Sequence, residues 1–186
     1  AAELAQISTE HAMVANRLCM PESKLGVWDR WLSTVYLPSC QDLKLRHMYE
    51  AMDLLHANIE EVEKTVFFNT ANLFNLEVDL IFYDTTTASF HVDYEDDDTD
   101  PDSNTTLRKF GHAKEGNWAP QVVVALAVTR DGIPVRSWVL PGNTADVTTV
   151  TKVRADLRGW NLGRAMFVAD SGMNSTDNRV ELAKAC

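Results

Sequence analysis

Apolar residues recur every three or four positions through the first third of the chain, which is the spacing of amphipathic helices. Two such stretches, residues 42 to 55 and 59 to 67, follow each other closely and predict an antiparallel helix pair. Trp28 and Trp31 belong to a further aromatic cluster on helical spacing, which is typical of a packed core. Residues 1 to 77 are therefore expected to form a helical N-terminal region.

The pattern changes at Glu77 to short runs rich in β-branched and aromatic residues. The first run, residues 78 to 84, reads VDLIFYD and is typical of a buried strand that ends in a carboxylate. Two more runs, residues 121 to 129 and 133 to 140, have Asp131 and Gly132 between them. Asp-Gly between two β-rich runs predicts a hairpin.

A helix and another strand follow the hairpin. Apolar residues recur at helical spacing from Val147 to Leu157, and Thr144 or Asp146 can cap the start of this helix. Residues 165 to 169 then predict a strand followed directly by Asp170, and a last helix is expected with Asp177 as its cap.

The order of elements over residues 78 to 186 is strand, hairpin, helix, strand, helix. This order matches the first part of an RNase H-like domain, in which the first strand is central and the strand after the first helix lies beside it. The predicted fold class is α/β, a partial RNase H-like mixed sheet with flanking helices, preceded by the helical region.

Asp84 and Asp170 each stand where a predicted strand ends. A right-handed crossover between adjacent parallel strands brings their carboxyl ends together, so these two carboxylates are expected to meet. Two close carboxylates repel, and they either share a proton or bind a cation. Oxygen ligands suit Mg²⁺ or Mn²⁺, and the sequence therefore predicts a metal site at Asp84 and Asp170.

Charge is unevenly distributed along the chain. The formal net charge is -10, but residues 1 to 102 hold 20 acidic and 6 basic side chains, whereas residues 103 to 186 hold 7 acidic and 11 basic ones. The later part is thus the candidate for contact with a polyanion. Six carboxylates lie between Glu95 and Asp102. This acidic run is interpreted as an exposed loop, with a metal-collecting or DNA-mimicking role as the alternatives.

Basic residues gather just before the second predicted strand. Arg108, Lys109, His112 and Lys114 are candidate DNA-binding residues because they can contact phosphate. The alternative is a solvated loop that balances the acidic run. Trp118 can stack on a base, although a role as a core or loop anchor is the favoured interpretation.

Several classes of protein are excluded or disfavoured. No apolar run is long enough to span a bilayer, and the first ten residues do not resemble a signal peptide. Cys19, Cys40 and Cys186 are far apart and odd in number, which disfavours disulfides and zinc and fits a reducing cytoplasm. No nucleotide-binding, serine-hydrolase or zinc-protease motif occurs.

Several strings together resemble one family over about residues 78 to 186. They are YDTTT at 83 to 87, FGHAKEG at 110 to 116, PQVVVALAVTRDGIPV at 120 to 135, PGNTAD at 141 to 146, LRGWNLG at 157 to 163 and VADSGM at 168 to 173. This combination resembles the DDE-type transposases of bacterial insertion sequences.

The resemblance implies that Asp84 and Asp170 are the first two catalytic carboxylates of a DNA transposase. Such an enzyme uses Mg²⁺ or Mn²⁺ to hydrolyse a phosphodiester at the transposon end and to join the freed 3′-hydroxyl to target DNA. Its partner is double-stranded DNA, and a homo-oligomer and a cytoplasmic location are also expected. The family's third carboxylate is a glutamate further downstream that this sequence does not reach, so the isolated chain is expected to be inactive.

Two alternatives stay open at the level of sequence. The chain can be a non-catalytic DNA-binding or dimerising remnant of a transposase, a role that the missing glutamate favours. It can also be another Mg²⁺-dependent phosphoryl-transfer enzyme with Asp84 as nucleophile. Such enzymes place a second aspartate two residues on, where this chain has Thr86, which disfavours that alternative.

Overall fold

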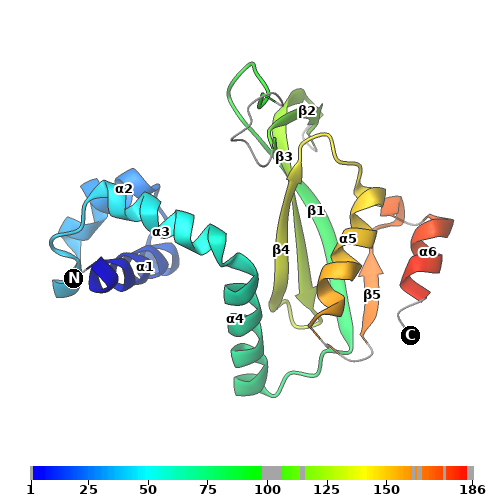
Figure 1. Ribbon diagram of the computed structural model, residues 1–186, viewed down its shortest axis with the longest axis horizontal. Helices are drawn as coiled ribbons and strands as arrows, with labels where there is room; N and C mark the ends of the chain where they lie inside the picture. The colour runs from blue at the N-terminus through cyan, green and yellow to red at the C-terminus, as the bar shows by residue number, and fades with distance from the viewer. Residues whose placement is uncertain are drawn as a thin grey trace. The chain divides into compact units, whose positions relative to one another are not determined.

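The computed structural model describes residues 2–97, 106–113, 116–160, 162, 165–173 and 175–183. Its chain divides into two compact units, Ala1–Val62 and Glu63–Cys186. Among the described residues, no helix is both long and apolar enough to cross a membrane. The α-helices and strands of both units are labelled in Figure 1.

The first unit is helical, as the periodicity predicts. Its elements are α1 (Ala2–Cys19), α2 (Lys24–Asp29), η1 (Trp31–Thr34), η2 (Pro38–Cys40), α3 (Leu45–Ala57) and the beginning of α4 (Ile59–Phe74). Trp31 is buried in its core with Val27 and Met48, whereas Trp28 is partly exposed and donates its indole N–H to the Leu43 carbonyl.

The prediction that the helices at residues 42 to 55 and 59 to 67 pack against each other as an antiparallel pair is wrong. The helix α3 packs against α1 and α2, while α4 places Phe67 in the core of the second unit. Periodicity shows that a helix has an apolar face, but it does not show which element covers that face.

The second unit is built on a five-stranded mixed sheet (Figure 1). Its strands are β1 (Leu80–Ser89), β2 (Lys109–His112), β3 (Trp118–Thr129), β4 (Pro134–Pro141) and β5 (Met166–Ala169). One edge of β3 pairs antiparallel with β1, and its other edge pairs antiparallel with β2 and then β4. The strand β5 pairs parallel with β1.

This topology confirms the predicted fold class. The first strand is central, the hairpin strands lie on one side of it, and the strand that follows the first helix lies on the other side. A mixed α/β sheet with flanking helices and this order is consistent with an RNase H-like fold.

One face of the sheet is covered and the other is open among the described residues. Phe67 of α4 and Val150, Val153 and Leu157 of α5 (Asp146–Arg158) form the core with alternate residues of the strands. Five large apolar residues on the opposite face are 36 to 66% exposed. They are Phe82, Leu126, Val139, Met166 and Val168.

A polar network joins α4 to β4 and α5 at the border of this core. One Glu63 carboxylate oxygen accepts hydrogen bonds from the backbone N–H, at 3.0 Å, and from the hydroxyl of Ser137. The Arg136 guanidinium lies 3.8 Å from Glu63 and 3.9 Å from Asp156, and it stacks over Trp138. Arg136 is thus a nearly buried cation held between two carboxylates.

Three local features differ from the predictions. The strand β1 does not end at Asp84 but continues to Ser89, because the β-branched threonines after Asp84 pair with β3. Asp146 lies in the first turn of α5 and the capping position is Ala145. The last helix, α6 (Thr176–Ala183), is capped by the Ser175 hydroxyl rather than by Asp177.

The short strand β2 was not predicted, because four residues are too few to show a period. It is held in place partly by a close backbone approach at Gly142. A Cβ at that position would lie 2.1 Å from the Gln121 carbonyl oxygen and 2.4 Å from that of Lys109. Only glycine lets these three segments meet as they do.

Candidate functional site

Asp84 and Asp170 occupy neighbouring positions, Asp84 within β1 and Asp170 directly after the end of β5, which runs parallel to β1. The last paired residues of β1 and β5 are Tyr83 and Ala169, and each aspartate is the next residue along the chain. Neighbouring strands lie about 4.8 Å apart, so the backbones of the two aspartates are close. Both side chains are exposed, and Asp84 lies on the open face of the sheet, opposite Leu126.

The two carboxylates are oriented by the same local contact. The Thr85 backbone N–H donates to Asp84 Oδ1 at 2.7 Å, and the Ser171 backbone N–H donates to Asp170 Oδ1 at 2.6 Å. The Ser171 hydroxyl is a second donor to the same oxygen, at 3.3 Å. One oxygen of each carboxylate is therefore fixed by the residue that follows it.

A second set of polar contacts lies on the covered face, directly beneath this position. The Thr85 hydroxyl donates to Asp146 Oδ1 at 2.8 Å, and the Tyr83 hydroxyl donates to the Thr149 hydroxyl at 2.7 Å. Burial raises the pKa of Tyr83, and the negative charges of Asp146 and Asp84 raise it further, against the opposing effect of the Thr149 hydrogen bond. The carboxylates of Asp146 and Asp84 thus both disfavour ionisation of the Tyr83 hydroxyl.

The donor set suits a hard divalent cation, because carboxylate oxygens are the ligands that Mg²⁺ and Mn²⁺ prefer. Within the described ranges, however, no three His, Cys, Asp or Glu side chains are grouped so that they could hold a metal ion. The described residues thus offer two carboxylates at this position and no third.

The acidic run and the basic cluster, predicted separately, contact each other. Arg108 Nη2 lies 2.8 Å from Asp96 Oδ1, and the backbone N–H of Arg108 donates to the other oxygen of that carboxylate. Lys109 Nζ lies 3.8 Å from Glu95 Oε2, and the Phe110 backbone N–H donates to Glu95 Oε1. Glu95 and Asp96, called the acidic segment below, therefore neutralise two of the predicted DNA-binding residues.

This contact changes the interpretation of the acidic run. As expected, residues 95 to 97 lie outside helices and strands and Glu95 is exposed, but the acidic segment also lies along β2 and is held there by ion pairs and backbone hydrogen bonds. Lys109 has only 11% of its side chain exposed. Residues 98 to 102 of the run and Lys114 lie outside the described residues.

Trp118 lies at the surface rather than in a core. Trp118 is 62% exposed, which contradicts the core part of its interpretation as a core or loop anchor. The indole stacks on Phe110, with ring centroids 6.5 Å apart, and meets the exposed His112 edge-on at 4.8 Å. Sequence could not show this, because the predicted strand began at Gln121 and its alternation therefore did not include Trp118.

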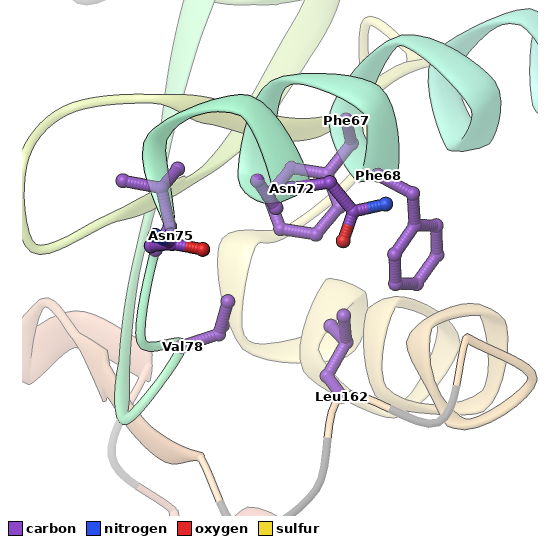
Figure 2. A pocket seen from close by; sticks show the side chains of 8 residues that line it. Phe67, Phe68, Asn72, Asn75, Val78 and Leu162 are labelled. Atoms are coloured by element: carbon purple, nitrogen blue, oxygen red, sulfur yellow. The ribbon is translucent and has the colours of Figure 1, made fainter.

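A pocket of about 520 Å³ is lined by a different set of residues, several of which are labelled in Figure 2. Its lining comes from α4, from the segment that leads into β1 and from Leu162 after α5. The lining residues are Phe67, Phe68, Ala71, Asn72, Asn75, Leu76, Val78 and Leu162. None of the predicted site residues lines it.

Comparisons with known proteins give one distant match. No family model matches the chain, and no curated protein matches it in sequence. A solved structure, the Mos1 transposase paired-end complex with left transposon end, is similar with a TM-score of 0.37 and 10% sequence identity. The match covers 95% of this chain and 56% of the Mos1 chain, so this chain spans little more than half of that protein.

Proposed function

We propose that this chain carries the first two carboxylates of a DDE-type DNA transposase, acting with Mg²⁺ or Mn²⁺ on phosphodiesters. The observation that carries the proposal is the adjacency of Asp84 and Asp170 at the point where β5 ends beside β1. The resemblance of the sequence around both residues to bacterial insertion-sequence transposases supports it.

The residues of the chain have distinct roles in this proposal. Asp84 and Asp170 hold the cation, and the backbone N–H groups of Thr85 and Ser171 fix the orientation of their carboxylates. A divalent cation bound there supplies Lewis acidity for attack of water or of a 3′-hydroxyl on phosphorus. The open face next to Asp84 leaves DNA access to this position.

The same geometry limits what the described residues do alone. Transfer of a phosphoryl group between two oxygens usually requires ligands for two cations. Two carboxylates without a third grouped beside them are expected to bind one cation weakly and to support little cleavage. This expectation favours DNA binding without catalysis as a second candidate function.

Oxidative cleavage of the protein by bound Fe²⁺ tests whether one cation is held by both Asp84 and Asp170. With ascorbate and peroxide, Fe²⁺ bound at the proposed site is expected to cut the polypeptide backbone near both Asp84 and Asp170. Excess Mg²⁺ should suppress both cuts together. Cuts near only one of the two residues, or cuts that Mg²⁺ does not suppress, would contradict a shared site.

DNA affinity is expected to depend on the acidic segment. Because Glu95 and Asp96 neutralise Lys109 and Arg108, the double variant Glu95→Gln with Asp96→Asn should bind duplex DNA roughly tenfold more tightly. Its salt dependence should also be steeper, because more phosphate contacts form. The measurement is fluorescence anisotropy with a labelled duplex over a range of salt concentrations.

The matched control for this variant is Asp131→Asn, which removes an exposed charge in the β3–β4 turn and should change DNA affinity little. Equal effects per charge removed, two in the double variant and one in the control, would reveal only a response to net charge. Adding Arg108→Gln to the double variant should abolish its gain, and a gain that persists would exclude Arg108 as a phosphate contact.

A further inference from the structure

The side chains of the residues on both sides of Asp84 are hydrogen-bonded to the first turn of α5. The preceding Tyr83 donates its hydroxyl to Thr149, and the Thr149 hydroxyl donates to the Asp146 carbonyl at 2.7 Å. The following Thr85, only 3% exposed, donates its hydroxyl to the Asp146 carboxylate. Because side chains alternate along a strand, these two residues point to the covered face while Asp84 points to the open one.

Two consecutive hydrogen bonds connect the Asp146 carboxylate to the Asp84 carboxylate. The Asp146 side chain accepts from the Thr85 hydroxyl at 2.8 Å, and the Thr85 backbone N–H donates to Asp84 Oδ1 at 2.7 Å. The position of Thr85 therefore sets the direction of the N–H group that orients Asp84. This part of β1 lies beyond the last residue paired with β5, so the contact with α5 replaces the support of that neighbouring strand.

We propose that Asp146 is a positioning residue for Asp84, acting through the Thr85 hydroxyl. The inference rests on the proposed function, because it assumes that Asp84 holds a cation. Ligands that are held in place before a cation binds lose less conformational freedom on binding. Loss of the contact between Asp146 and Thr85 therefore lowers cation affinity without removing a ligand.

A purely structural role for Asp146 makes a different prediction. A carboxylate in the first turn of a helix interacts favourably with the helix dipole, and its loss then lowers stability alone. A direct effect of its negative charge on the cation makes a third prediction, since that effect does not require Thr85. Cation affinity and thermal stability, measured on the same variants, separate these roles.

The experiment is a calorimetric Mn²⁺ titration of the whole chain and of Thr85→Val, Asp146→Ala and the double variant. Each single change is expected to lower the affinity about tenfold, the low end of the range for residues that orient metal ligands. The double variant should lose no more than the larger single loss. Thr85→Ser keeps the hydroxyl and Asp146→Asn keeps an acceptor oxygen, so both should retain most of the affinity even if Asp146→Ala folds poorly.

Three results would overturn the proposal. They are additive losses in the double variant, a loss in Asp146→Asn as large as in Asp146→Ala, and a lower melting temperature with unchanged Mn²⁺ affinity in every variant. Failure of the proposed function looks different, because Asp84→Asn would then leave Mn²⁺ affinity unchanged as well.

Discussion

Replacing Asp84 or Asp170 with asparagine is expected to lower Mn²⁺ affinity by about 100-fold, since residues that only orient ligands already contribute 10- to 100-fold. The physical reason is that a neutral amide loses the charge that attracts a hard cation, while its size stays the same. Both variants should fold normally, because both side chains are exposed. Calorimetric titration measures the affinity, and circular dichroism checks the fold.

The control for these variants is again Asp131→Asn, which should bind Mn²⁺ like the parent chain. An unchanged affinity in both Asp84→Asn and Asp170→Asn would exclude the site. Incubation with transposon-end DNA and Mn²⁺ adds a second measurement, in which little cleavage is expected. Robust cleavage that disappears in Asp84→Asn would show that another carboxylate of the chain completes the site.

Removing Glu63 is expected to be the most destabilising single change in the polar network of the second unit. In Glu63→Ala the nearly buried Arg136 loses one of its two carboxylates, and the Ser137 N–H loses its acceptor. The expected loss is about 2 to 3 kcal/mol, below the 3 to 5 kcal/mol of a fully buried pair because Glu63 is partly exposed. The melting temperature should fall by roughly 5 to 10 °C.

Urea unfolding followed by circular dichroism measures this loss. The matched control is Glu77→Ala, the same substitution at an exposed loop position, which should stay within about 0.5 kcal/mol of the parent chain. Similar losses in both variants would mean that the network around Arg136 contributes little. Glu63→Met combined with Arg136→Met should be less damaging than Glu63→Ala, because the nearly buried guanidinium is removed together with Glu63, and Asp156, which is 30% exposed, keeps the hydrogen bond from the Trp138 indole N–H.

The sheet was predictable because its signals are local and its connection is chirally constrained. The β-rich runs and the Asp-Gly turn identified β1, β3 and β4, and the right-handed crossover rule placed β5 beside β1. The adjacency of Asp84 and Asp170 followed from those elements alone. The part of the proposed metal site that depends on strand pairing could thus be predicted from sequence.

Contacts between side chains far apart in the sequence were not predictable in the same way. The ion pairs of Glu95 and Asp96 with β2 depend on how a long excursion between strands folds back, and no periodicity encodes that path. Asp146 was interpreted only as a helix cap. Its hydrogen bond to Thr85 forms only because α5 packs on the sheet and β1 continues past Asp84. The sequence pattern of either segment alone does not show that the two meet.

The pairing of β1 with β5 also has a consequence for the order of folding. The β1–β3–β4 meander joins segments that are closer along the chain than β1 and β5, since β5 joins Leu80 to Met166 across the whole intervening sequence. Closing a longer loop costs more entropy, and such contacts slow folding. The meander is thus expected to form first, and Asp170 reaches Asp84 only when the last strand docks.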